Sequence, residues 1–139
     1  MSETGKQVAV GIDLGGTAVK IGIVNASYEI LAQTSIPTNA GRPYEAVIAD
    51  MGKTAASLLD GNGFLVADCA GVGVGSPGTI DSQNGVVLYS NNIRWDNVPL
   101  AKELQKYLPV PVCVQNDANC AALGEVLCGA AKGFQNAVF

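Results

Sequence analysis

A ten-residue segment, GIDLGGTAVK, carries groups that could bind a phosphate. The adjacent glycines Gly15 and Gly16 can adopt positive φ and leave backbone amides uncovered, so a turn built on them offers a concavity of N–H dipoles. Thr17 adds a hydroxyl donor and Lys20 a cation. Asp13 adds a carboxylate that could hold Mg²⁺ directly or through a water molecule. We predict a phosphate site; the alternative is an ordinary glycine turn in which Asp13 caps its own backbone.

A second polar pair, Asn116-Asp117, follows an apolar run and precedes an alanine-rich segment. Asn offers a donor and an acceptor together, which suits paired hydroxyl groups such as those of a sugar. The Asp117 carboxylate could accept a hydroxyl proton while the hydroxyl oxygen attacks a phosphorus atom. Helix capping is the alternative for either residue, but one cap explains only one of the two. We predict that Asp117 is a catalytic base and that the pair binds substrate.

Two further loops could share the edge on which that pair lies. Ser76-Pro77-Gly78 ends an apolar strand, and carboxyl ends of parallel strands are where open α/β sheets bind ligands. Asn91-Asn92 precede Ile93-Arg94-Trp95, and Asn92 either contacts a sugar or fixes its own loop through backbone hydrogen bonds.

Two other phosphate-binding motifs do not fit. The sequence contains no GxxxxGK[ST] string, which excludes a Walker A loop. Residues 73–78 (GVGSPG) match a dinucleotide-binding fingerprint by letters, but turn-forming residues follow them where that motif requires a helix. We therefore reject dinucleotide binding.

The composition indicates one cytoplasmic domain. The chain has 139 residues, of which 48% are hydrophobic and 14% charged, with a net charge of −4. No cluster of Lys or Arg could follow a nucleic-acid backbone, and no apolar run is long enough for a signal peptide or a membrane span, so we expect neither partner. Four cysteines without a CxxC pair, and no histidine, predict buried thiols, no disulfide and no structural zinc site here.

The pattern of apolar residues predicts the elements that position these groups. Three strand-like runs separated by short links suggest an antiparallel meander, and apolar residues at helical spacing follow. Strands are predicted at 7–13, 19–25, 30–36, 70–75, 85–89 and 110–115, and helices at 44–59, 100–107 and 117–128. The order predicts an α/β domain with a mixed five-stranded sheet, a β-meander plus parallel strands, flanked by helices.

Four blocks together resemble the ROK family (repressor, open reading frame and kinase). They are residues 11–17 (GIDLGGT) with Lys20, 75–81 (GSPGTID), 90–95 (SNNIRW) and 115–125 (QNDANCAALGE). The resemblance implies an actin/hexokinase-like ATPase lobe. In the family's motifs, residues 13–17 match the first phosphate motif, Gly78, Asn92 and Asn116 match sugar contacts, and Asp117 matches the catalytic base.

The resemblance also implies an activity, namely phosphorylation of a hexose or N-acetylhexosamine by ATP and Mg²⁺. Residues 1–139 would be the amino-terminal lobe, so we expect negligible activity without the carboxy-terminal lobe, where the family carries its second phosphate motif and a zinc site. A full-length protein of this kind is expected to form a dimer. A sugar-sensing lobe of a ROK-type repressor and another actin-like ATPase stay open, as do the identity of the sugar and the choice between ATP and polyphosphate.

Overall fold

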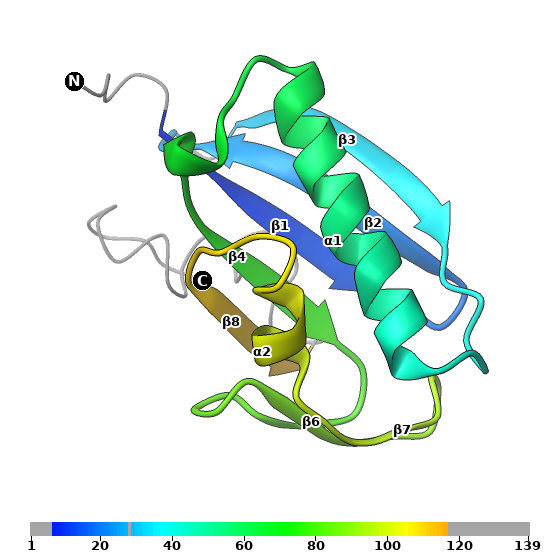
Figure 1. Cartoon of the computed structure of the whole chain (residues 1–139). Coiled ribbons are helices and arrows are strands. Elements are labelled where there is room, and N and C mark those ends of the chain that lie inside the picture. The colour runs from blue at the N-terminus through cyan, green and yellow to red at the C-terminus, as the bar shows by residue number, and fades with distance from the viewer. Residues whose placement is uncertain (1–6, 28, 117–139) are drawn as a thin grey trace.

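The computed structural model describes residues 7–27 and 29–116, which form two β-sheets with helices packed on the larger one (Figure 1). The strands are β1 (Val8–Leu14), β2 (Ala18–Asn25), β3 (Ile30–Pro37), β4 (Cys69–Ser76), β5 (Thr79–Asp81), β6 (Val86–Ser90), β7 (Trp95–Val98) and β8 (Val112–Asn116). The α-helices are α1 (Tyr44–Gly61) and α2 (Leu100–Leu104), and a 3₁₀ turn spans Val66–Asp68. Within the described part of the chain, no helix is long and apolar enough to cross a membrane.

The larger sheet has five strands in the order β3-β2-β1-β4-β8. β1, β2 and β3 pair antiparallel through short turns, whereas β4 pairs parallel with both β1 and β8. A parallel pair needs a crossover connection, and α1 and α2 supply the two crossovers. The predicted mixed sheet of a β-meander plus parallel strands is therefore confirmed.

The core lies between one face of this sheet and the two helices (Figure 1). Alternate residues of β1 point to opposite faces, and Val8, Val10, Ile12 and Leu14 all lie buried on the helix side. α1 meets them with a stripe at helical spacing, formed by Val47, Ile48, Met51, Ala55 and Leu59. The other residues of β1, Ala9, Gly11 and Asp13, consequently lie on the face away from the helices.

Most element boundaries differ from the sequence prediction by one or two residues, and the differences at α2 and β8 have identifiable causes. α2 was expected at 100–107, but it ends at Leu104 and the chain closes through tighter i→i+3 bonds from Lys106 to Glu103 and from Tyr107 to Leu104. β8 begins at Val112, because Pro111 has no N–H to donate to the ladder.

The second sheet was mostly missed. Only a strand at 85–89 was predicted, whereas β5, β6 and β7 form a three-stranded antiparallel sheet. β5 and β7 have three and four residues. Strands this short do not establish an alternation that can be recognised in sequence.

The cysteine prediction holds only in part. Cys69 is a free, buried thiol, and its burial raises its pKa. Cys113 is disulfide-bonded, so the expectation of no disulfide is wrong for this residue. Disulfide formation depends on how close the fold brings two Cβ atoms, which sequence spacing does not reveal. The helix predicted at 117–128 lies outside the described residues.

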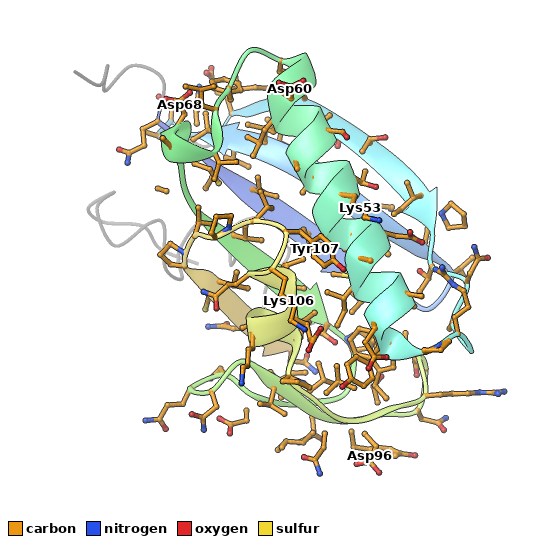
Figure 2. The ribbon with its side chains drawn as sticks, viewed as in Figure 1. Lys53, Asp60, Asp68, Asp96, Lys106 and Tyr107 are labelled. Atoms are coloured by element: carbon orange, nitrogen blue, oxygen red, sulfur yellow. The ribbon has the colours of Figure 1, made fainter. Side chains whose placement is uncertain are left out.

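The contact between α1 and the segment after α2 gives a stability prediction. Tyr107 lies against α1 in Figure 2, and a Cβ atom at Gly52 would lie 2.5 Å from the Cβ of Tyr107. We expect Gly52→Ala to lower the free energy of unfolding by about 1–3 kcal/mol through overpacking. Gly61→Ala, at the end of the same helix with nothing within 4 Å, is the control and should be neutral or slightly stabilising. Urea unfolding measures both, and equal effects would contradict the close packing.

Candidate active site

The carboxyl ends of β1, β4 and β8 meet at one edge of the larger sheet. The parallel register pairs Asp13 of β1 with Gly75 of β4, and it pairs Ser76 of β4 with Asn116 of β8. The hairpin loop of residues 15–17 and the loop that begins at Pro77 therefore leave the sheet on the same side. This edge is where open α/β sheets place their ligands.

The hairpin between β1 and β2 is fixed by three backbone-directed hydrogen bonds. The Gly15 N–H donates to the Ala18 carbonyl at 3.0 Å, and the Thr38 N–H donates to the Thr17 carbonyl at 2.8 Å. The Thr38 hydroxyl donates to the Gly15 carbonyl at 2.7 Å. The Gly15 amide is thus used inside the turn, whereas the amides of Gly16 and Thr17 have no partner within the described ranges and both residues are exposed.

Asp13 and Lys20 lie beside each other on the face of the sheet away from the helices. They are direct cross-strand partners in the β1–β2 ladder, and both side chains are exposed. Among the described residues the ion pairs are Arg42–Asp50 and Lys106–Glu103, and neither involves Asp13 or Lys20. The predicted carboxylate and cation therefore stand at the end of the hairpin with both charges accessible.

Gly78 occupies a conformation that favours glycine, with φ of +103°. Its carbonyl accepts a hydrogen bond of 2.7 Å from Nδ2 of Asn116, across 38 residues of sequence. A Cβ atom on Gly78 would collide with the Tyr89 carbonyl and lie 2.8 Å from the Cβ of Ser90. The structure thus brings together two of the predicted sugar contacts, Gly78 and Asn116.

Asn92 lies at the hairpin. A Cβ atom on Gly16 would lie 3.7 Å from both the Cβ and the carbonyl oxygen of Asn92, which is van der Waals contact. The loop that carries Asn92 begins directly after Ser90, next to Gly78. The predicted phosphate-binding and sugar-binding residues are therefore joined by a continuous series of contacts. Asp117, the predicted base, follows Asn116 and lies outside the described residues.

Sequence reasoning missed two buried hydroxyl groups near this edge, those of Thr38 and Ser90. Thr38 is 1% exposed and forms the hairpin contacts given above. The Ser90 hydroxyl is buried and has no hydrogen-bond partner among the residues that the structure describes. A single Thr or Ser after an apolar run carries no sequence signal, since many such residues only pack or fix a turn.

Asp81 belongs to the motif at residues 75–81, and its carboxylate is hydrogen-bonded within a turn. Both of its oxygens accept hydrogen bonds from Asn84, at 3.2 Å from the backbone amide and 2.8 Å from the side chain. These bonds, the side-chain bond first, lower the pKa of Asp81. The two hydrogen bonds therefore hold the Asp81 carboxylate within its own turn.

The meander, the parallel strands and the glycine hairpin at the strand edge define the chain as a lobe of the actin-like ATPase class. The chain belongs to the ROK family, whose sequence model matches residues 9–139.

Three comparisons show the range of its relatives. A glucokinase from Thermotoga maritima is 38% identical over 130 residues, which cover 93% of this chain and 39% of that protein. A crystal structure of a ROK family glucokinase from Streptomyces griseus, in complex with glucose and AMPPNP, aligns with a TM-score of 0.72 and 31% identity over 91% of this chain and 38% of the other. A xylose repressor from Caldicellulosiruptor bescii is 30% identical over 116 residues, 84% of this chain and 29% of that protein. The chain thus spans about two fifths of the glucokinases it matches.

The crowding at Gly78 gives a prediction that needs no assumption about function. Gly78→Ala adds a side chain in a positive-φ conformation and against the Tyr89 carbonyl, so we expect it to lower the free energy of unfolding by more than about 2 kcal/mol. Gly63→Ala is the matched control, because Gly63 has φ of +82° but nothing within 4 Å. It should cost only about 1 kcal/mol. Equal losses in denaturant unfolding would show that the close approach at Gly78 contributes nothing.

Proposed function

We propose that this chain forms the amino-terminal lobe of a sugar kinase that transfers the γ-phosphoryl group of ATP to a hexose or N-acetylhexosamine. The observation that carries the proposal is the close approach of Gly16 of the hairpin to the loop of Asn92, where a Cβ atom on Gly16 would lie 3.7 Å from Asn92. A phosphate held by the hairpin and a sugar held by Asn92 would be neighbours, as phosphoryl transfer requires. The complex of the Streptomyces griseus relative with glucose and AMPPNP supports this pairing of ligands.

In the proposed reaction a sugar hydroxyl oxygen attacks the γ-phosphorus, and the bond from that phosphorus to the bridging oxygen of ADP breaks. Asp117 accepts the hydroxyl proton and orients the nucleophile, which is the main task of the base when the transition state is loose. Asn116, already hydrogen-bonded to Gly78, and Asn92 position the sugar. The amides of Gly16 and Thr17, which have no partner among the described residues, bind phosphate oxygens together with Lys20.

The residues present fit a nucleotide–magnesium complex. Asp13 is an exposed carboxylate at the hairpin, and carboxylate oxygens are the ligands that Mg²⁺ takes, commonly together with waters and substrate phosphates. Bound there, the ion would neutralise charge on the phosphates.

A sugar-sensing repressor lobe is the second candidate, and the xylose repressor relative favours it specifically. A sensor needs the sugar contacts but has no use for a proton acceptor or a phosphate-binding hairpin. The chain carries Asp117 together with residues 13–17, so the kinase explains more of its residues. Dimer formation, a zinc site in a carboxy-terminal lobe, the cytoplasmic location and ATP rather than polyphosphate as donor stay predictions.

Replacement of the proposed base tests the mechanism. We expect Asp117→Asn, in the natural full-length protein, to leave the sugar Kd nearly unchanged and to lower kcat by about two orders of magnitude or more. Asp96→Asn is the matched control, because Asp96 is exposed on β7 and points away from the helices (Figure 2). A coupled assay for ADP and calorimetry with the sugar measure the two quantities. Unchanged turnover in Asp117→Asn would remove Asp117 from the mechanism.

The proposal also predicts how activity is distributed along the protein. We expect the 139-residue polypeptide to show no ATP-dependent phosphorylation of glucose, mannose or N-acetylated hexosamines under conditions in which the full-length protein is active. The physical reason is that one lobe presents only one side of the nucleotide. Release of ADP by the short polypeptide, with a dependence on sugar concentration, would contradict the division of the site between two lobes.

A further inference from the structure

We propose that Thr38 is a positioning residue that aims the Gly16 amide at the bound phosphate, an inference that rests on the kinase function proposed above. Thr38 lies directly after β3 and is 1% exposed. It contacts both sides of the hairpin loop, through its hydroxyl to the Gly15 carbonyl at 2.7 Å and through its N–H to the Thr17 carbonyl at 2.8 Å. A single residue thus fixes two carbonyl groups of the phosphate-binding turn.

The geometry of the peptide bond converts the first contact into a direction for the amide. The Gly15 carbonyl and the Gly16 N–H belong to one peptide unit, which is trans, so they point in opposite directions. Since the carbonyl points at the Thr38 hydroxyl, the N–H points away from it, on the exposed side of the turn. The Gly16 N–H has no partner within the described residues, and this orientation leaves it available for an anion.

Thr38 is needed because this peptide unit would otherwise turn easily. It is flanked by glycines on both sides, and glycine populates positive and negative φ with similar ease. Rotation of the unit would replace the N–H with the carbonyl, whose partial negative charge repels phosphate. The hydrogen bond from a buried hydroxyl selects the orientation that binds an anion before any ligand arrives.

Arg42 holds Thr38 itself in place. Its Nη2 donates to the Thr38 carbonyl at 2.9 Å, and its Nε donates to the Asn39 carbonyl at 3.1 Å. The same guanidinium pairs with Asp50 of α1 at 3.0 Å. The Arg42 and Asp50 side chains are 34% and 47% exposed, so the pair adds little stability. Its contribution is geometric, since it connects the loop behind the hairpin to a helix packed on the core.

The test separates nucleotide binding from sugar binding in the natural full-length protein. Thr38→Val keeps the shape and removes the hydroxyl, and we expect it to raise the Kd for AMPPNP and the KM for ATP about tenfold. The KM for the sugar should change by less than about twofold, because the hydroxyl that is removed donates to the Gly15 carbonyl of the hairpin. Thr38→Ser restores the hydroxyl and should return the Kd for AMPPNP to within about twofold of the wild-type value.

Thr34→Val is the matched control, since Thr34 lies on β3 and makes no side-chain hydrogen bond among the described residues. It should leave both affinities unchanged. A folded Thr38→Val protein with wild-type affinity for AMPPNP would overturn the proposal, as would a Thr38→Ser protein as weak as Thr38→Val. Should Thr38→Val fail to fold, Arg42→Met decides: a rise of about threefold in the Kd for AMPPNP supports the proposal and no rise overturns it.

These outcomes are distinct from a failure of the kinase function. If the wild-type protein phosphorylates no sugar, the proposed function fails, while the affinities of the same variants for AMPPNP still decide what Thr38 does.

Discussion

The parallel register between β1, β4 and β8 is the constraint on which the rest of the structure depends. It aligns Asp13 with Gly75 and Ser76 with Asn116, so the carboxyl ends of the three strands meet at one edge of the sheet. A shift of one residue would move every side chain to the opposite face. Ile12 would then leave the core beneath α1, and the Asp13 carboxylate would enter it, where an unpaired charge is costly. The burial that stabilises the fold therefore also fixes the position of the site.

Much of this arrangement is visible in the sequence because strands and helices repeat. The β-branched run of β1 and the helical spacing in α1 each extend over several residues, and both elements form close to their predicted positions. The strands β5 and β7 have no such repeat and were missed. The hydrogen bond from Asn116 to Gly78 could be anticipated only as proximity at a sheet edge, since no pattern specifies which carbonyl an amide finds. Thr38 gave no signal, because its importance comes from a contact across 23 residues.

The hairpin loop that carries Gly16 and the loop that carries Asn92 lie next to each other. Gly16 contacts the Asn92 loop, and the same loop follows Ser90, which packs against Gly78. The approach at Gly78 depends on the absence of a side chain, whereas a Cβ atom at Gly16 would fit at van der Waals distance from Asn92. In the proposed kinase, the separation between the phosphate and the sugar would therefore be set by backbone packing between the hairpin and the asparagine loop. Such a separation is more rigid than one set by long side chains, whose rotamers are costly to order.

A lobe of this fold occurs both in glucokinases and in a repressor, so the fold does not decide between an enzyme and a sensor. The residues that hold the turn distinguish the two. A sugar sensor gains nothing from a glycine turn with two amides that lack a partner among the described residues, and ordering such a turn costs conformational entropy. Here Thr38 fixes it from a buried position, and Arg42 ties Thr38 to α1. A buried hydroxyl and an ion pair thus hold one peptide unit in a single orientation. Phosphate binding requires that orientation, which favours the kinase.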